Sequence, residues 1–267
     1  MGSQQPAHVR GAQAAQALRH REQLGFEPID IWLLLDRLEV PVAVREFGTG
    51  FGDGLYIWED DEPLIVINAS ARPSRQRFTA AHELGHHEMH RFEADQLLLT
   101  DENIFGSQDA WEIEANAFAA YLLAPDEGVR QRLAKHTGDD ITPDMVVETM
   151  AAFGLSYNAM TYRLLNVGLI NRAQRAALIE NALVEERMRR AGIDEDGSFK
   201  SPTHLPRTHI NAALRLYEDH VVTPNRLGEL LDMSHNDAIE FAQARGIRPT
   251  AEHPVDDDAV DALLRDR

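Results

Sequence analysis

The sequence predicts an α+β protein that is mostly helical, with a small three-stranded sheet and a helical C-terminal extension. Three observations lead to this prediction. Short apolar stretches typical of strands cluster between residues 41 and 68, helical patterns fill most of the chain after Ser74, and a Gly-, Ser- and Pro-containing stretch interrupts them at residues 192–207. The 267 residues, 43% of them hydrophobic, suit one large domain or two small ones.

The strands are expected after a helical segment at residues 7–38. Residues 41–47, 55–58 and 64–68 each form a short apolar stretch, and the last two flank an acidic turn. The third strand either pairs with an extended peptide or is an ordinary buried strand, and the sequence leaves both interpretations open.

The domain boundaries follow from the Gly-, Ser- and Pro-containing stretch at residues 192–207. Residues 172–190 are predicted to form one long charged helix that leads into it. We therefore divide the chain into a first domain at residues 1–191, a linker at residues 192–207, and a helical, helix-turn-helix-like domain at residues 208–267.

Two parts of the chain share a pattern of helix caps. Thr142-Pro143 and Thr223-Pro224 each supply an N-cap residue followed by proline at the first helical position. In each part a later serine is followed twelve residues on by glycine, at Ser156 and Gly168 and again at Ser234 and Gly246. Two helix-turn-helix units and two helical hairpins with the same capping chemistry both explain this similarity.

The composition excludes several classes of site and partner. The chain has no cysteine, which removes disulfides, thiolate nucleophiles and cysteine-ligated zinc, so any metal must be bound by His, Asp or Glu. The formal net charge of -18 is spread along the chain and argues against general binding to nucleic acid or to an anionic membrane. No apolar run approaches the length of about 20 residues of a membrane span, and the N-terminus has no signal-peptide core, so a cytoplasmic protein is expected.

The chemistry is concentrated in residues 77–88, which contain the pattern His-Glu-x-x-His. On a helix, His82 and His86 lie one turn apart on the same face, where both imidazoles can bind one Zn²⁺. Glu83 is rotated by about 100° from His82, so it can act on a water molecule at the metal without displacing it. The small, apolar neighbours of the pattern favour a buried metal site over an accidental pair of histidines.

A catalytic zinc site needs a third protein ligand and one open position. Met89 and Phe92 stand where one extended motif would place Gly and His, so that class is excluded. His90 continues the same helix face, but three ligands along one straight helix would span about 12 Å. We therefore expect His87 and His90 to face solvent or to support the ligands from behind.

The third ligand is expected from a second helix at residues 111–123. Glu112 shares a face with alanines that permit close packing against the first helix, whereas Glu114 points to another face. We therefore favour Glu112 as the ligand, keep Glu114 as the alternative, and expect Asn116 to support a ligand by a hydrogen bond. An ordinary exposed charged face remains the other interpretation of both glutamates. The candidates for an additional oxyanion-stabilising group are Tyr157, Tyr162 and Arg163.

Further motifs accompany the histidine pattern. They are RFTAAHELGH at residues 77–86, EIEANAFA at 112–119, LLAP at 122–125, FGLSY at 153–157, Arg163-Leu164 and GLI at 168–170. Through these motifs the chain resembles the ImmA/IrrE family of metallopeptidases over a core of about residues 25–172. Ala124 stands where the family more often has Met, and residues 173–267 lie outside the resemblance.

The resemblance implies a thermolysin-like zinc peptidase core whose ligands, two His and a Glu, are His82, His86 and Glu112 here. It also implies a protein substrate, a repressor-type transcription factor, whose cleavage relieves transcriptional repression in a stress response or a mobile element. The predicted function is therefore that of a Zn²⁺-dependent endopeptidase with Glu83 as the general base. The glycines at residues 48–54 are expected to form a flexible rim of its cleft.

Two alternative functions stay open at this point. A non-cleaving, metal-containing module could sequester a regulator, although the presence of Glu83 weighs weakly against it. A DNA-binding regulator would need basic second helices, whereas residues 157–167 and 235–245 each hold a single arginine. Direct nucleic-acid binding is therefore not expected, and protein–protein contact is the preferred role for residues 208–267.

Overall fold

The computed structural model describes residues 5–46, 52–59, 61–92, 97–100, 107–136, 140–193 and 205–247. The chain divides into two compact units, Met1–His204 and Leu205–Arg267. Each unit has its own cluster of buried hydrophobic side chains. Most of the predicted linker lies outside the described residues.

A four-stranded sheet lies in the first unit. Its order is β1-β3-β2-β4, with β1 at Val42–Arg45, β2 at Gly54–Glu59, β3 at Glu62–Asn68 and β4 at Leu97–Thr100. Strand β3 pairs parallel with β1 and antiparallel with β2, and β4 pairs antiparallel with β2. The three predicted strands are confirmed, and β3 is an internal strand.

The sheet has four strands instead of the predicted three, and the structure decides between the two interpretations of the third strand. Strand β3 cannot add an extended peptide, because its two edges are already bonded to β1 and β2. The sequence also gave no sign of β4, since a run of three leucines and a threonine has no decisive strand preference. These four residues form strand β4 because they pair with the backbone of β2 at Leu55 to Trp58.

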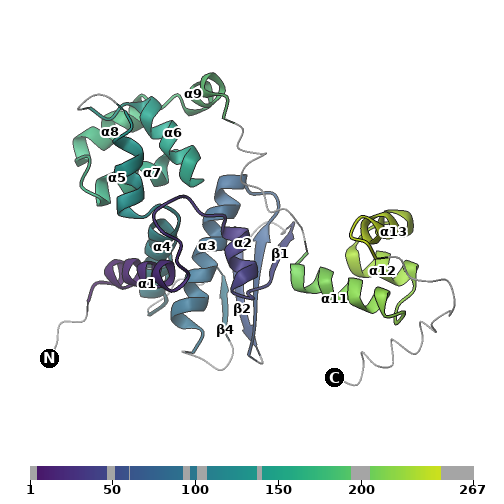
Figure 1. Ribbon diagram of the computed structural model, residues 1–267. Coiled ribbons are helices and arrows are strands. Elements are labelled where there is room, and N and C mark those ends of the chain that lie inside the picture. The colour runs from purple at the N-terminus through teal and green to yellow at the C-terminus, as the bar shows by residue number, and fades with distance from the viewer. Residues whose placement is uncertain are drawn as a thin grey trace. The chain divides into compact units, whose positions relative to one another are not determined.

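Helix α3 (Pro73–His90) lies between the sheet and helix α4 (Ser107–Leu123), as Figure 1 shows. The two helices approach closely at Gly85, where a Cβ atom would lie 3.2 Å from the Cα atom of Ala115 and 3.1 Å from Cδ1 of Phe118. Ala115 and Ala119 are completely buried. The predicted close packing through small residues is therefore confirmed, and it fixes α4 against the helix that carries the histidines.

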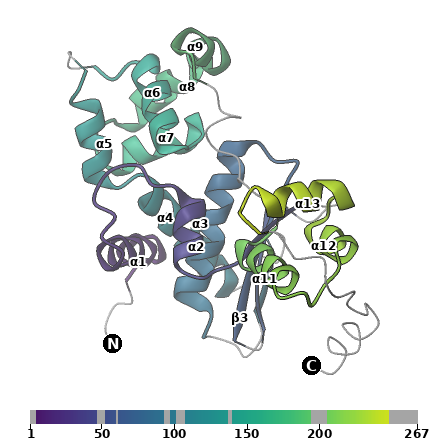
Figure 2. The ribbon, with the colours of Figure 1, turned by 45° about the vertical axis from the view of Figure 1, so that its right-hand side comes forward.

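Helix α1 (Ala7–Arg21) packs on α4, and the short helix α2 (Ile31–Arg37) follows it (Figures 1 and 2). The contact between α1 and α4 is close at Gly11, where a Cβ atom would lie 3.0 Å from Cβ of Ala117. Asp30 caps α2 by accepting hydrogen bonds from the backbone of Trp32 and Leu33. The helices predicted within residues 7–38 are thereby confirmed.

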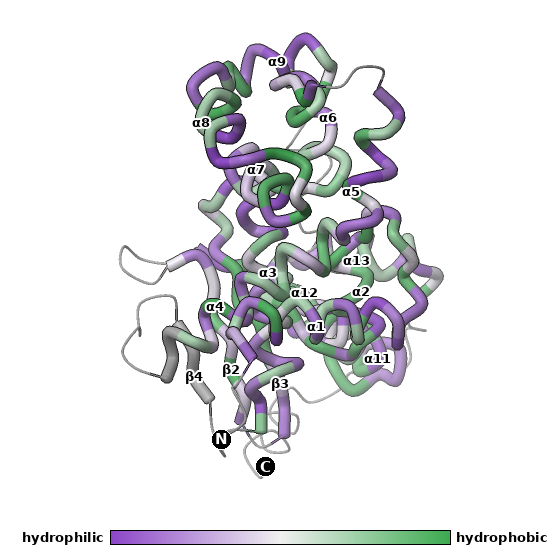
Figure 3. Tube along the Cα trace, turned by 90° about the vertical axis from the view of Figure 1, so that its left-hand side faces the viewer, coloured by the Kyte–Doolittle hydropathy of each residue, from purple (hydrophilic) through white to green (hydrophobic). Residues whose placement is uncertain are grey.

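Five shorter helices follow α4 in the part of the first unit that the structure describes. They are α5 (Asp126–Leu133), α6 (Pro143–Phe153), α7 (Tyr157–Asn166), α8 (Arg172–Glu180) and α9 (Val184–Ala191). Hydrophobic and hydrophilic stretches alternate along α8 and α9 in Figure 3. No described helix has the length and apolarity needed to cross a membrane.

The single helix predicted at residues 172–190 was wrong, because α8 and α9 are separate. The side chain of Asn181 bonds to the carbonyl of Ala177, and Leu183 takes a left-handed conformation with φ of 39°. Charge and helical periodicity alone did not reveal this break, because both helices carry similar patterns.

The second unit contains α11 (Arg207–Glu218), α12 (Pro224–Leu231) and α13 (His235–Gln243). Its caps match those of α6 and α7. The side chains of Thr142 and Thr223 each accept a hydrogen bond from a backbone N–H in the first turn of the helix, and each threonine is followed by proline. Ser156 and Ser234 cap the helices that follow in the same way. The predicted capping similarity is confirmed.

Candidate metal centre and active site

His82 and His86 lie on one face of α3 and point their Nε2 atoms at the same place. The two nitrogens are 3.1 Å apart, and the side chains are 6% and 1% exposed. The sequence spacing accounts for this arrangement, since residues four apart on a helix are neighbours. Two buried imidazole nitrogens at this separation are suited to sharing one cation.

Glu112 on α4 completes the group. Its Oε2 atom lies 3.2 Å from Nε2 of His82, and its Oε1 atom lies 3.2 Å from Nε2 of His86. Ligand atoms that bind one zinc ion tetrahedrally at 2.0–2.1 Å lie about 3.3 Å apart, so this spacing fits a metal. Two imidazoles and a carboxylate are also the donor set that a catalytic zinc site uses.

The protonation of the group favours metal binding at neutral pH. Burial lowers the pKa of His86 to about 4, despite the opposing hydrogen bond with Glu112. Burial alone would raise the pKa of Glu112, but hydrogen bonds with His82 and His86 outweigh it and lower that pKa well below its usual value. His86 is therefore a neutral imidazole and Glu112 a carboxylate.

Glu83 is buried beside this group, with 2% of its surface exposed. Its carboxylate lies against the start of β2, where a Cβ atom on Gly54 would be 2.8 Å from Oε1 of Glu83. The same Cβ atom would lie 2.2 Å from Cγ2 of Thr79, so only glycine leaves room there for both side chains. Of the glycines expected at the cleft rim, Gly54 borders the site, while Gly48 and Gly50 lie outside the described residues.

Glu114, the alternative third ligand, is engaged elsewhere. Its Oε2 atom lies 2.7 Å from Nε2 of His90, and Arg10 forms an ion pair with its Oε1 atom. His90 in turn reaches Nδ1 of His86, which is the nitrogen that faces away from His82. His90 is therefore buried behind a histidine of the group, and Glu114 is one step further away.

Asn116 lies one turn after Glu112 and lines the same cavity as His82 and Glu112. The three oxyanion candidates make their contacts elsewhere. The hydroxyl of Tyr157 donates to the carbonyl of Leu178, the guanidinium of Arg175 lies over the ring of Tyr162, and Arg163 binds Ala124 and Asp126. These contacts join α7 to its neighbouring helices.

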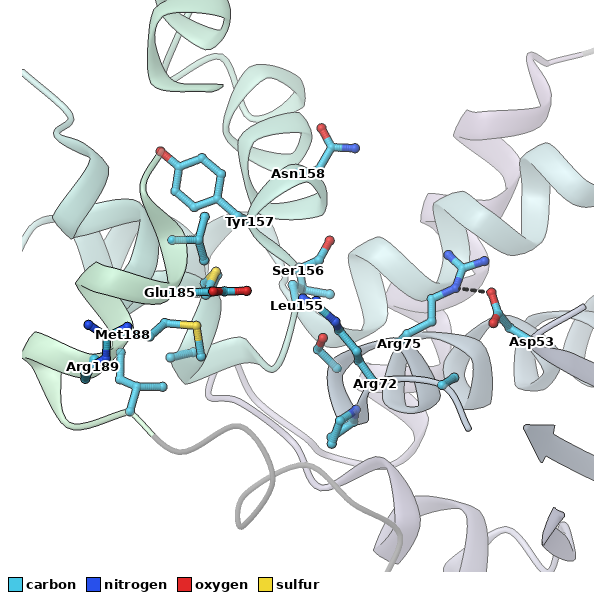
Figure 4. A pocket seen from close by; sticks show the side chains of 17 residues that line it. Asp53, Arg72, Arg75, Leu155, Ser156, Tyr157, Asn158, Glu185, Met188 and Arg189 are labelled. Carbon is cyan, nitrogen blue, oxygen red and sulfur yellow. Dashed lines mark hydrogen bonds and ion pairs between the residues drawn. The ribbon is translucent and has the colours of Figure 1, made fainter. Parts of the chain in front are cut away.

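Two cavities share Arg75 in their lining. One, of about 200 Å³, is lined by His82, Glu112, Asn116, Thr79, Phe78 and Arg75. The other, of about 880 Å³, lies between the start of α3 and helices α6, α7 and α9, and Arg75 lines it too (Figure 4). Arg75 is held there by Asp53, with Nε 2.6 Å from Oδ2. Met188 on α9 and Leu155 before α7 belong to its apolar lining.

Comparison with known proteins finds the IrrE N-terminal-like domain at residues 35–165. Residues 35–165 form a domain of the ImmA/IrrE family. This range includes α3, α4, the whole sheet and the group formed by His82, His86 and Glu112. The sequence resemblance to the ImmA/IrrE family is thus confirmed.

Two curated relatives each match about a third of this chain. The uncharacterized immunity region protein 2 of Bacillus phage phi105 is 37% identical over 89 residues, which are 33% of this chain and 55% of that protein. The radiation response metalloprotease IrrE of Deinococcus radiodurans is 33% identical over 104 residues, covering 35% of this chain and 28% of IrrE. The chain therefore spans about half or less of the length of each.

Reasoning from the sequence missed several neighbours of the group. Arg10 and Gly54 are far from it along the chain, and no motif marks them. His90 did carry a signal, because it stands four residues after His86 and continues the helix face. Its hydrogen bond with Glu114 depends on how α3 and α4 pack, and the spacing of residues within one helix does not predict that packing.

Proposed function

We propose that this protein is a zinc-dependent endopeptidase that hydrolyses a peptide bond in a regulatory protein of the repressor type, and thereby relieves transcriptional repression in a stress response or a mobile element. The observation that carries the proposal is the convergence of His82, His86 and Glu112 within 4.8 Å, with the carboxylate of Glu83 buried beside them.

The choice of metal rests on the donor set. Two imidazole nitrogens and one carboxylate oxygen match catalytic zinc sites, and magnesium or calcium would prefer oxygen ligands alone. The chain contains no cysteine that could supply a competing thiolate site. When bound, the metal would polarise the scissile carbonyl and make a water molecule more acidic.

The residues of the chain would then do the following. His82, His86 and Glu112 hold the metal, and Glu83 accepts a proton from the attacking water and delivers it to the leaving amine nitrogen. Burial of Glu83 keeps bulk water from competing for that proton. The wall at Gly54 holds the carboxylate in position, so little reorganisation is needed during the reaction.

The size of the cavities supports a polypeptide substrate. The small cavity has room for the reacting bond, and the larger cavity of about 880 Å³ has room for several side chains of a bound segment. The relatives named for an immunity region and for a radiation response support a substrate with a regulatory role.

The second unit supports partner binding better than DNA binding. Its last described helix, α13, carries Asp237 and Glu240, whose charges would repel phosphate. We therefore propose that residues 208–267 contact protein, including the substrate. A pure binding module is the weaker alternative, because it needs no buried carboxylate next to the metal ligands.

The test is a comparison of the parent chain with Glu83→Gln and Glu88→Gln. Each is co-expressed with a candidate repressor protein, and the metal content of each purified protein is measured. We expect zinc in all three, and cleavage by the parent and Glu88→Gln but a loss of about 10²–10⁴-fold in Glu83→Gln. Cleavage that persists in Glu83→Gln would overturn the mechanism, and absence of zinc from all three would overturn the metal site.

A further inference from the structure

We infer that His90, Glu114 and Arg10 form a hydrogen-bonded relay that fixes the tautomer and orientation of His86 for metal binding. The three are positioning residues, since none of them belongs to the proposed ligand set. The inference rests on the proposed metal site and goes beyond it by assigning a purpose to three buried or partly buried polar groups outside it.

The relay runs through three helices without a break. Nδ1 of His86 lies 3.0 Å from Nδ1 of His90, and Nε2 of His90 lies 2.7 Å from Oε2 of Glu114. Nε of Arg10 donates to Oε1 of Glu114 at 2.5 Å. The relay thus connects α3, through α4, to α1 near the N-terminus of the described chain.

We assign the direction of each hydrogen bond from the last partner and from a neutral His90, the form that carries a lone pair on one ring nitrogen. A glutamate paired with a guanidinium is ionised, so it can only accept, and Nε2 of His90 must donate to it. The neutral imidazole of His90 then has a lone pair on Nδ1, which accepts from Nδ1–H of His86. His86 is left with its lone pair on Nε2, the atom that faces His82 and Glu112.

The surroundings make this arrangement rigid. His90 and Glu114 are 2% and 4% exposed. Trp111 stacks on the ring of His90, with centroids 4.8 Å apart and planes at 16°. The close approach of α1 to α4 at Gly11 brings the neighbouring Arg10 to Glu114. A metal-binding histidine generally needs such a partner on its other nitrogen to hold its orientation.

A purely structural clamp between α1, α3 and α4 would use the same contacts. The two roles differ in what they predict for metal binding. A clamp predicts that loss of the relay lowers stability but leaves the affinity of the folded protein for zinc unchanged. The relay predicts that zinc affinity falls even when the metal-free fold is intact, and that an acceptor for His86 restores part of it.

The test uses His90→Leu and His90→Asn, whose side chains have nearly the same size and shape. Asparagine keeps an acceptor oxygen close to the position of Nδ1, whereas leucine has none. His87→Leu is the matched control, because His87 is the neighbouring, half-buried histidine and bonds to Tyr56 instead. The dissociation constant for Zn²⁺ is measured by competition with a chromophoric chelator, and the metal-free fold is checked by circular dichroism.

We expect His90→Leu to raise the zinc dissociation constant about 10- to 100-fold, His90→Asn to raise it less, and His87→Leu to leave it within about twofold. Values within twofold of the parent for a folded His90→Leu would overturn the relay. If His90→Leu does not fold, Glu114→Gln decides the matter in the same assay. Failure of the parent itself to bind zinc would instead overturn the proposed metal site.

Discussion

Gly54 and Glu83 approach so closely that a methyl group on Gly54 would lie 2.8 Å from Oε1 of the glutamate. This distance is shorter than a normal contact between a carbon and an oxygen atom. The start of β2 therefore forms one wall of the space that holds the carboxylate. Because α3 also packs on β2, the sheet determines where the proposed general base stands.

Substitution of Gly54 by alanine is expected to impair catalysis without impairing metal binding. The new methyl group would lie 2.2 Å from Cγ2 of Thr79 and 2.8 Å from Oε1 of Glu83, so both side chains must move. A shift of about 1 Å in a reacting group can lower the rate by about 100-fold. Turnover and zinc affinity are measured on the same preparation. Gly128→Ala is the control, because its methyl group would crowd Phe153 and the backbone of Phe26 instead. A turnover equal to that of the control would contradict the prediction.

The two glutamates of α4 are expected to differ in their effect on metal affinity. Glu112→Gln removes a proposed ligand, so zinc binding should weaken by more than about 100-fold, whereas Glu114→Gln acts only through His90 and should weaken it less. Both substitutions keep the size of the side chain. Chelator competition on the two purified variants checks the order, and a larger loss for Glu114→Gln would reassign the third ligand.

The metal-free protein should lose stability as the pH falls from about 6.5 to about 4. Burial lowers the pKa of both His86 and His87 to about 4 in the folded chain, whereas an unfolded histidine titrates near 6.5. In this window the unfolded state binds more protons, so acidification favours it by at most about 1.4 kcal/mol per pH unit for each histidine. Above the window this contribution to stability is fully present.

Urea unfolding at several pH values in the presence of a chelator measures this loss. His87→Leu removes one of the two groups, so the fall in unfolding free energy between pH 6.5 and 4 should be smaller than in the parent. Carboxylates that titrate in the same range cancel in the difference between the two proteins. Parallel curves for parent and variant would show that folding does not lower the pKa of His87, which would contradict the prediction.

A bulky side chain in the larger cavity should weaken substrate binding. Met188 lines that cavity from α9, so Met188→Trp fills space that we assign to the substrate segment. We expect the KM for the protein substrate to rise about tenfold, a loss of about 1.4 kcal/mol, with zinc affinity unchanged. Arg190→Trp, on the same helix but absent from the cavity lining, is the control. An equal KM for both variants would place the substrate elsewhere.

Periodicity and capping predicted much of the fold, because they act over a few residues. The helices around His82 and Glu112 and three of the strands were predictable in this way. The strand β4 was not, since its conformation depends on the free edge of β2 rather than on its own four residues. The break at Leu183 was missed for a related reason, because its left-handed backbone leaves no mark in the pattern of charges.

The sequence by itself determined that two histidines and a glutamate share one helix, that no thiolate takes part, and that a second helix with small residues follows. Only the tertiary structure decided that Glu112 faces the histidines while Glu114 faces His90, and that Gly54 lies against Glu83. The physical reason is the distance along the chain between the residues that interact. Spacing of four residues fixes neighbours within a helix, but partners on different elements are set by how closely those elements pack, here through Gly11, Gly54 and Gly85.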